Sequence, residues 1–228
     1  MAEKMRELAG LMHHLTPYPV FRIGPVTIDS TVVNTWIAMA ILFALVYWLS
    51  RGLSTRPGRR QALLEAIVGF VANMAESDLG DAGRRYIPWV GTLLLFILVM
   101  NLSWFIPNMI PPTTDLSTTA ALAVTTILFV HIEGIRRGGW KYVKRYFQPM
   151  FIMFPLNIME ELVKPVSLAV RLYGNMFGGK LVVLALGILV PLLVPVPIML
   201  LEVLLGSIQA YIFAILTVAY LDMMFRGH

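Results

Sequence analysis

The chain has 228 residues, of which 58% are hydrophobic and only 14% are charged, and its formal net charge is +5. This composition is too apolar for a soluble domain and indicates a protein that crosses a membrane several times. The absence of cysteine excludes disulfides, thiolate catalysis and iron–sulfur clusters. Because the basic residues fall in short loops between apolar runs, the positive-inside rule explains the net charge better than nucleic-acid binding.

The N-terminal segment, residues 1–29, carries acids among its bases and has no long apolar core, so we expect an external segment and no cleavable signal peptide. Residues 31–50 predict the first membrane helix. The basic loop after it should be cytoplasmic and contains Arg51, Arg56, Arg59 and Arg60. Residues 60–78 place their apolar side chains on one face, which predicts an amphipathic helix at the membrane interface.

Two further membrane helices are predicted, one from about residue 87 to 107 and one from about 117 to 135. Arg84 and Arg85 precede the first of these helices, and Arg136 and Arg137 follow the second. The start of the first helix and the end of the second should therefore face the cytoplasm. The proline-rich connection IPNMIPPTTD has Asp115 as its only charge and should therefore turn on the outer side. With this orientation the N-terminus lies outside the cell.

The last third of the chain carries charges in apolar surroundings, namely Glu160, Glu161, Lys164, Arg171 and Lys180. A charge at membrane depth costs at least ~3 kcal/mol, so these side chains must face protein or water. Prolines at 191, 195 and 197 precede a final apolar run to Phe225, which predicts two long helices folded back on each other. Arg226 favours a cytoplasmic C-terminus. We therefore predict an all-α polytopic membrane protein of about five to six helices, with residues 30–228 as one integral membrane domain.

A polar stripe runs along the first of these two helices. At ~100° per residue, one face holds Glu160, Lys164, Ser167, Arg171, Asn175 and Gly178. Arg171 is treated as a buried fixed cation, since a guanidinium cannot lose its proton to avoid the cost of burial. The final helix carries a second, sparser line that includes Glu202, Gly206 and Gln209, and the two lines could meet.

The segment SLAVRLYGNMFGG at 167–179, together with GSIQAYIF at 206–213, resembles the membrane-embedded subunit a of F-type rotary ATP synthases. The resemblance covers roughly the last three quarters of the chain. It implies a non-catalytic stator of a bacterial cell membrane, without cofactor or metal, that contacts a ring of c subunits and the peripheral-stalk b subunits. Protons would pass through two offset half-channels, and their flow would drive rotation of the ring and ATP synthesis.

The resemblance also implies roles for individual residues. Arg171 takes the position of the essential arginine, and Asn175 and Gln209 match polar positions that line the rotor interface. A ring carboxylate must be protonated in lipid but is stabilised as an anion opposite a guanidinium. Nearby glycines at 174, 178 and 179 would either pack helices closely or leave a smooth surface for the passing ring.

Further residues match positions on the proton routes. They are Asn101 and Asp115 on the outer side, Glu160 and Glu161 on the inner side, and Glu202 within a half-channel. Lys180 departs from the family pattern, in which this position is often acidic or histidine. We hypothesise that it pairs with Glu202, because an unpartnered ammonium in this setting would be costly.

Other interpretations stay open at this stage. Asn175 and Gln209 could be polar glue between helices, and Glu160 and Glu161 could be ordinary interfacial acids. A secondary ion transporter should show inverted repeats, which we do not find. An intramembrane lipid-headgroup enzyme could hold a phosphate ester with Arg171, but the sequence lacks clustered aspartates, a nucleophile with its base and a phosphate-binding loop.

Overall fold

The computed structural model describes residues 19–23, 26–53, 58–106, 109–140, 142, 154–189 and 195–226. Residues 1–18 of the predicted external segment, part of the basic loop and Pro191 lie outside these ranges. Five helical stretches in the described part of the chain are long and apolar enough to cross a membrane. The prediction of an all-α polytopic membrane protein is thereby confirmed.

The first membrane helix follows a small hairpin. Strands β1 (Pro19–Ile23) and β2 (Val26–Asp29) pair antiparallel, a feature that the sequence analysis did not predict. Helix α2 then spans Ser30–Ser50, in agreement with the predicted 31–50. Most of its large side chains are exposed, Phe43 to 81%, as suits a helix that faces lipid or a partner.

Helix α3 (Arg59–Leu79) confirms the helix predicted at 60–78 and buries one face through Val71, Met74 and Ala75. The 3₁₀ segment η1 (Gly80–Tyr86) leads into α4 (Ile87–Leu102). The prediction that this membrane helix extends to about residue 107 is wrong, because α4 is followed by the 3₁₀ turn η2 (Ser103–Phe105). Pro107 disfavours helical backbone in Ile106, the residue before it, and Ile106 is extended at the point where η2 ends.

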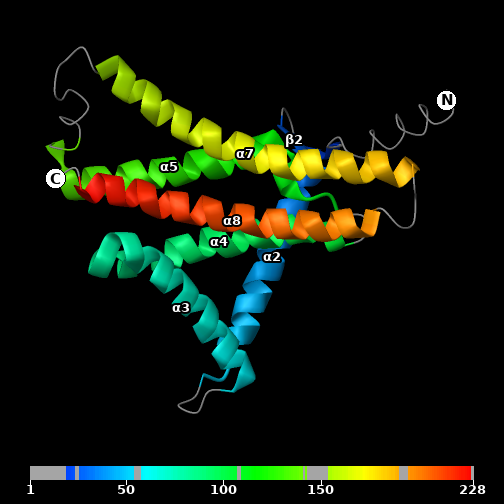
Figure 1. Cartoon of the computed structure of the whole chain (residues 1–228), viewed down its shortest axis with the longest axis horizontal. Helices are drawn as coiled ribbons and strands as arrows, with labels where there is room; N and C mark the ends of the chain where they lie inside the picture. The colour runs from blue at the N-terminus through cyan, green and yellow to red at the C-terminus, as the bar shows by residue number, and fades with distance from the viewer. Residues whose placement is uncertain are drawn as a thin grey trace.

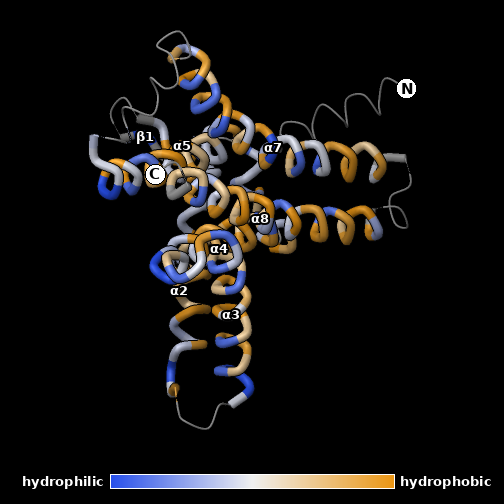
Figure 2. Tube along the Cα trace, turned by 60° about the vertical axis from the view of Figure 1, so that its left-hand side comes forward, coloured by the Kyte–Doolittle hydropathy of each residue, from blue (hydrophilic) through white to orange (hydrophobic). Residues whose placement is uncertain are grey.

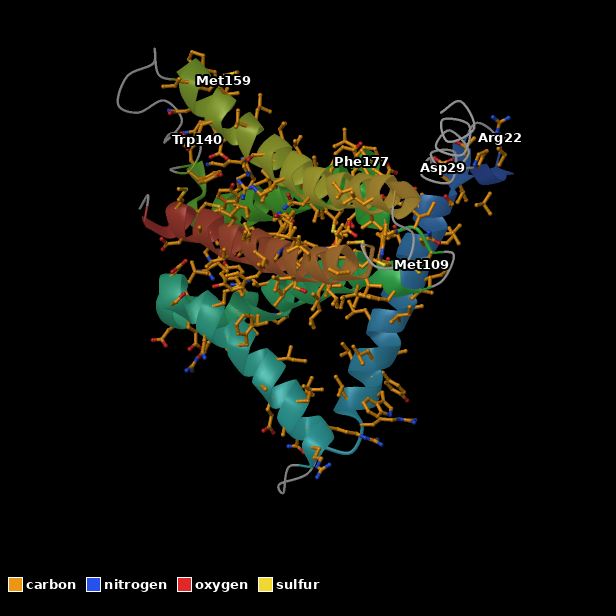
Figure 3. The ribbon with its side chains drawn as sticks, turned by 45° about the vertical axis from the view of Figure 1, so that its right-hand side comes forward. Arg22, Asp29, Met109, Trp140, Met159 and Phe177 are labelled. Carbon is orange, nitrogen blue, oxygen red and sulfur yellow. The ribbon has the colours of Figure 1, made fainter. Side chains whose placement is uncertain are left out.

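Helix α5 (Leu116–Gly138) follows the short 3₁₀ segment η3 (Pro112–Thr114) and exceeds the predicted 117–135 by a few residues. The two long C-terminal helices are α7 (Phe154–Leu189) and α8 (Pro195–Arg226). They run antiparallel, as predicted, and α7 continues through Pro165 without a break. In Figure 3, Met159 lies near the start of α7 and Phe177 lies in the second half of the same helix.

Four helices form the body of the molecule. In Figure 1, α4, α5, α7 and α8 lie side by side along the long axis, and the main contacts are α5 with α7 and α4 with α8. The buried core includes Ile97, Leu172 and Phe213 from three of these helices. Helix α2 crosses this layer steeply, so the five membrane helices cannot all stand perpendicular to one bilayer.

Helices α2 and α3 form a V whose open end is closed by α4 (Figure 1). The tip of the V is hydrophilic, whereas its arms are largely apolar (Figure 2). A hydrophilic tip fits a location near the lipid headgroups.

Candidate functional site

Arg171 lies midway along α7 and is exposed in this chain. Its Nη2 is 3.5 Å from Ser167 Oγ, and no carboxylate in the described part of the chain forms an ion pair with it. The expectation of a buried cation is therefore wrong for the chain by itself. The reason is that α7 packs the neighbouring face inward, where Leu168 and Leu172 are buried, so Arg171 lies at the edge of the packed surface. A permanent charge at membrane depth needs a partner.

The glycines around Arg171 divide into two groups. A Cβ atom added to Gly174 or Gly178 would meet no atom within 4 Å, so both face open space. These positions lie three and seven residues after Arg171 and share its face of the helix. Gly179 instead packs against the Glu202 side chain so closely that a Cβ would overlap it. Close packing is thus present at Gly179, whereas Gly174 and Gly178 are open, and their contact with a ring stays a prediction.

Asn175 and Gln209 connect the two long helices. Asn175 Nδ2 donates a hydrogen bond of 2.8 Å to Gln209 Oε1. Asn175 is exposed on the Arg171 side, whereas Gln209 is only 1% exposed. The prediction that the two polar lines could meet is confirmed at this pair, which joins α7 to α8 and presents an amide beside the guanidinium.

Lys180 and Glu202 are both buried, each with 6% exposure. Lys180 follows Leu172 and Met176 along the inward stripe of α7, which explains its burial. Neither its Nζ nor the two Glu202 oxygens have a hydrogen-bond partner among the described residues, and the two groups form no ion pair within 4.0 Å. The ammonium instead lies 5.8 Å from the centre of the Trp104 ring, within cation–π range. The hypothesised pair shares one buried region but is not in direct contact.

Asn101 joins the same region from α4, because its Nδ2 donates to the Gly206 carbonyl oxygen at 2.8 Å. We define the buried polar seam as Asn101, Trp104, Lys180, Glu202 and Gln209, each of which has a buried polar atom without a partner in the described chain. Buried polar groups are nearly always satisfied by protein or by ordered water. These buried polar groups gather where α4 and η2 meet α7 and α8.

Asp115 has a clear structural role at the N-terminus of α5. Its carboxylate accepts hydrogen bonds from the Ser117 backbone at 3.1 Å and the Ser117 hydroxyl at 2.6 Å. It also accepts one of 3.2 Å from Thr31 of α2. Capping of this kind stabilises helix starts, so Asp115 fixes the turn between α4 and α5 and attaches α2 to it.

The inner acids form a second cluster, toward the start of α7. Glu161 receives a hydrogen bond of 2.8 Å from Lys164 and lies 3.7 Å from His131 Nε2 of α5. The Glu160 side chain is 67% exposed and lies 3.7 Å from the same lysine. His131 was not among the predicted site residues, since its approach to Glu161 depends on how α5 packs against α7.

A third polar cluster, also not predicted, surrounds Glu133 of α5. This carboxylate is 5% exposed and accepts a hydrogen bond of 2.9 Å from Tyr86. Arg137 Nε lies at 3.2 Å and Arg85 Nη2 at 3.8 Å. Glu133 lies inside the predicted helix 117–135, and the sequence could have indicated a polar cluster around it, because intramembrane charges need partners. The cluster joins η1 to the end of α5.

Comparisons with known proteins agree with this architecture. Residues 32–222 match the family model described as ATP synthase A chain. ATP synthase subunit a of Moorella thermoacetica is 52% identical over 218 residues, which cover 95% of this chain and 100% of the relative. ATP synthase subunit a 2 of a Bradyrhizobium species is 41% identical over 208 residues, with 91% and 93% covered. The chain therefore belongs to the ATP synthase subunit a family, in agreement with the resemblance drawn from its sequence.

Proposed function

We propose that this chain, a proton-translocating stator subunit of F-type ATP synthase, presents the Arg171 face of α7 to a ring of c subunits. The observation that carries the proposal is an exposed guanidinium on a membrane helix whose uncovered surface also includes the apolar Val170, which is 52% exposed. The open positions at Gly174 and Gly178 allow a neighbouring helix to approach closely. The secondary-transporter and lipid-enzyme interpretations are not favoured by the family match.

A ring carboxylate supplies the partner that Arg171 lacks. In lipid the carboxyl group must be protonated, whereas opposite the guanidinium its anion is stabilised. At ~4 Å and an effective dielectric constant of ~20 the attraction is ~4 kcal/mol. A membrane potential contributes ~2.3 kcal/mol per charge for each ~100 mV. These values are comparable, so the contact favours proton release without holding the ring in place.

Two separate polar routes would serve this contact. The buried polar seam, with Asn101, Lys180 and Glu202, is the proposed outer half-channel, and Asp115 stabilises the turn at its outer end. The cluster of Glu160 and Glu161 is the proposed inner half-channel. At ~1.5 Å per residue, Glu161 and Lys180 lie ~15 Å and ~13 Å along α7 from Arg171, on opposite sides of it. A fixed cation between the routes repels protons that would cross without rotation.

The chain itself is proposed to be non-catalytic, with ATP formed elsewhere in the complex. The basic residues after α2 and at the end of α5 support a cytoplasmic location for these ends, an outer location for the N-terminal segment 1–29 and a cytoplasmic C-terminus. We place the protein in the bacterial cell membrane, among lipids, with the peripheral-stalk b subunits as further partners.

Replacement of Arg171 by alanine tests the proposal. In inverted membrane vesicles, the Arg171→Ala complex should lose proton-driven ATP synthesis, because the ring carboxylate loses its anionic partner. Ser167→Ala, one turn away, is the matched control and should retain synthesis. Proton-driven synthesis at the control rate in Arg171→Ala would defeat the assignment.

The predicted rotor contact can be measured directly, because the chain has no cysteine of its own. Gly178→Cys should form a disulfide with a cysteine placed beside the carboxylate of the ring subunit, since position 178 has open space around it. Phe43→Cys on α2, where the native side chain is 81% exposed, is the control for exposure alone. Equal cross-linking at both positions would contradict the proposed orientation.

A further inference from the structure

The Lys180 ammonium lies over the ring of Trp104. Its Nζ is 5.8 Å from the ring centre, within cation–π range. Lys180 is 6% exposed, and among the described residues its Nζ has no hydrogen-bond partner and no ion pair. Cation–π attraction is strongest for tryptophan and for cations that are shielded from water. The Trp104 ring is therefore a substantial part of the surroundings that stabilise this charge.

Trp104 reaches the lysine because of the way α4 ends. Asn101, in the last turn of α4, donates from its Nδ2 to the Gly206 carbonyl oxygen at 2.8 Å and so fixes this end of α4 against α8. Trp104 follows three residues later in η2, and residues at this spacing share a face of a helix. The ring is therefore turned toward the buried polar seam, where its Nε1 is buried without a partner in the described chain.

The Glu202 carboxylate lies near the backbone of Lys180 and yet is not in contact with its ammonium. A Cβ added to Gly179 would be 2.8 Å from Glu202 Cδ, and the Cα atoms of neighbouring residues are ~3.8 Å apart. The long, flexible lysine side chain could therefore reach this carboxylate. No Glu202 oxygen, however, is within 4.0 Å of Nζ. The lysine extends toward Trp104 instead of toward the acid.

A direct ion pair between the two groups would impair a proton route through Glu202. A carboxylate in contact with an ammonium is stabilised as the anion and binds protons less readily. In buried surroundings such a pair is also strongly attractive. A carboxylate that must bind and release protons in turn therefore works better with the cation nearby but out of contact.

We propose that Trp104 is a positioning residue of the outer half-channel, which holds the Lys180 ammonium by cation–π contact and so keeps the Glu202 carboxylate able to exchange protons. This inference rests on the proposed assignment of the buried polar seam to that half-channel. Lys180 of α7 and Glu202 of α8 are the titratable groups of the seam, whereas Asn101, Trp104 and Gln209 carry no ionisable group. The ring thus acts on Glu202 through Lys180.

Fluorinated tryptophan at position 104 tests the contact itself. Fluorine withdraws electron density from the indole face that attracts the cation, and it changes the shape of the ring little. The whole ATP synthase, with one, two or three fluorines on this ring, is reconstituted into liposomes. ATP synthesis is measured as the pH on the outer side varies, with the inner pH and the potential held constant. The outer proton concentration that gives half-maximal synthesis should rise with each fluorine.

Substitution of the ring extends the series. Trp104→Leu removes the aromatic face and should raise the half-maximal outer proton concentration about tenfold, the lower end of the effect of a neighbouring opposite charge. The maximal rate, reached at acidic outer pH, should change much less, because protons then compete with the ammonium for the carboxylate. Trp104→Phe keeps a weaker aromatic face and should give a smaller shift.

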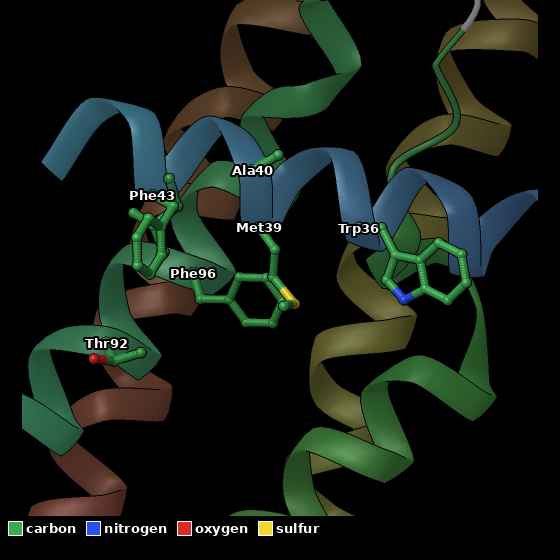
Figure 4. A pocket seen from close by; sticks show the side chains of 7 residues that line it. Trp36, Met39, Ala40, Phe43, Thr92 and Phe96 are labelled. Atoms are coloured by element: carbon green, nitrogen blue, oxygen red, sulfur yellow. The ribbon is translucent and has the colours of Figure 1, made fainter. Parts of the chain in front are cut away.

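Two tryptophans outside the seam serve as controls. Trp89 stacks on Phe129 with ring centres 4.0 Å apart, and its Nε1 is also buried without a partner in the described part of the chain. Trp36 is 55% exposed and lines a hollow between α2 and α4 (Figure 4). Fluorination of either ring should leave the half-maximal outer proton concentration unchanged.

A second background shows whether Lys180 carries the effect. In Lys180→Met there is no ammonium to hold, so fluorination of Trp104 should no longer shift the outer pH dependence. In the Trp104→Leu complex, electron cryo-microscopy should place Lys180 Nζ within ion-pair distance of a Glu202 oxygen.

The positioning role would be overturned by an unchanged pH dependence across the fluorine series, or by a shift that persists in full in Lys180→Met. Either result leaves the proposed outer half-channel standing if Glu202→Gln alters the outer pH dependence. An unaltered dependence in Glu202→Gln would instead remove the half-channel assignment. Because fluorinated rings keep the native shape, the series decides the matter even if Trp104→Leu prevents assembly of the complex.

Discussion

Replacement of Gly179 by alanine should move the Glu202 side chain. A Cβ at position 179 would overlap Glu202 Oε1 and lie 2.7 Å from its Cγ and 2.8 Å from its Cδ. Overpacking of this kind costs ~1–3 kcal/mol, whereas the higher helix propensity of alanine returns ~1 kcal/mol. The net loss of stability should therefore be ~0–2 kcal/mol. A displaced carboxylate in the proposed outer half-channel should also slow proton flow.

The adjacent glycine provides a matched control. Gly178→Ala adds the same methyl group where no atom lies within 4 Å, so this subunit should gain up to ~1 kcal/mol from helix propensity. The Gly178→Ala and Gly179→Ala subunits should thus differ by ~1–3 kcal/mol in stability. Gly178→Ala should slow ATP synthesis only through the rotor contact. Stability can be measured as the retention of the subunit in the complex on heating in detergent, and activity as proton-driven ATP synthesis in inverted vesicles.

A double-mutant cycle tests whether the overlap with Glu202 causes the loss of stability in Gly179→Ala. Glu202→Asp shortens the side chain by one methylene and should make room for the methyl group of Gly179→Ala. The coupling between the two changes should be ~0.5–3 kcal/mol, as is usual for residues in contact. Strictly additive losses, or equal destabilisation by Gly178→Ala and Gly179→Ala, would refute the reasoning.

Two further predictions concern buried charges. Tyr86→Phe removes the phenolic donor of the 2.9 Å hydrogen bond to Glu133 and should destabilise the subunit by ~1–3 kcal/mol. The same heating assay measures this loss. An unchanged retention of the subunit on heating would mean that Arg137 alone satisfies Glu133. Lys180→Ala and Glu202→Gln should lower proton pumping less in combination than the sum of their separate effects, because each leaves the other charge without its counterpart in the seam. Strictly additive losses in a proton-pumping assay would remove the idea that the two groups are coupled.

The helices were largely predictable because each depends on local properties of the chain. Charge-free runs of about 20 residues match the hydrocarbon thickness, and α2 was therefore predicted to within one residue of its start. The end of α4 was missed because η2 follows it directly, so the apolar run outlasts the α-helix. The small hairpin before α2 was missed because its strands are too short to give a periodic signal.

The predicted site residues differ in how far the sequence could describe them. Arg171 was identified from its charge and its neighbours, but its exposure follows from which face of α7 packs inward. Glu133 carried a usable signal as an acid inside a predicted membrane helix. His131 carried none, because its proximity to Glu161 arises only when α5 lies against α7.

The sequence by itself determined the membrane class, the number and order of the long helices, and the family, since hydropathy, charge and motif spacing are properties of contiguous residues. The tertiary structure decided which polar residues share a space. It separated Gly179, which packs on Glu202, from Gly178, which faces outward, and it gathered residues of α4, α7 and α8 into the buried polar seam. The physical reason is that burial and polar satisfaction depend on the relative rotation and tilt of helices, which are set by packing between segments far apart in the chain.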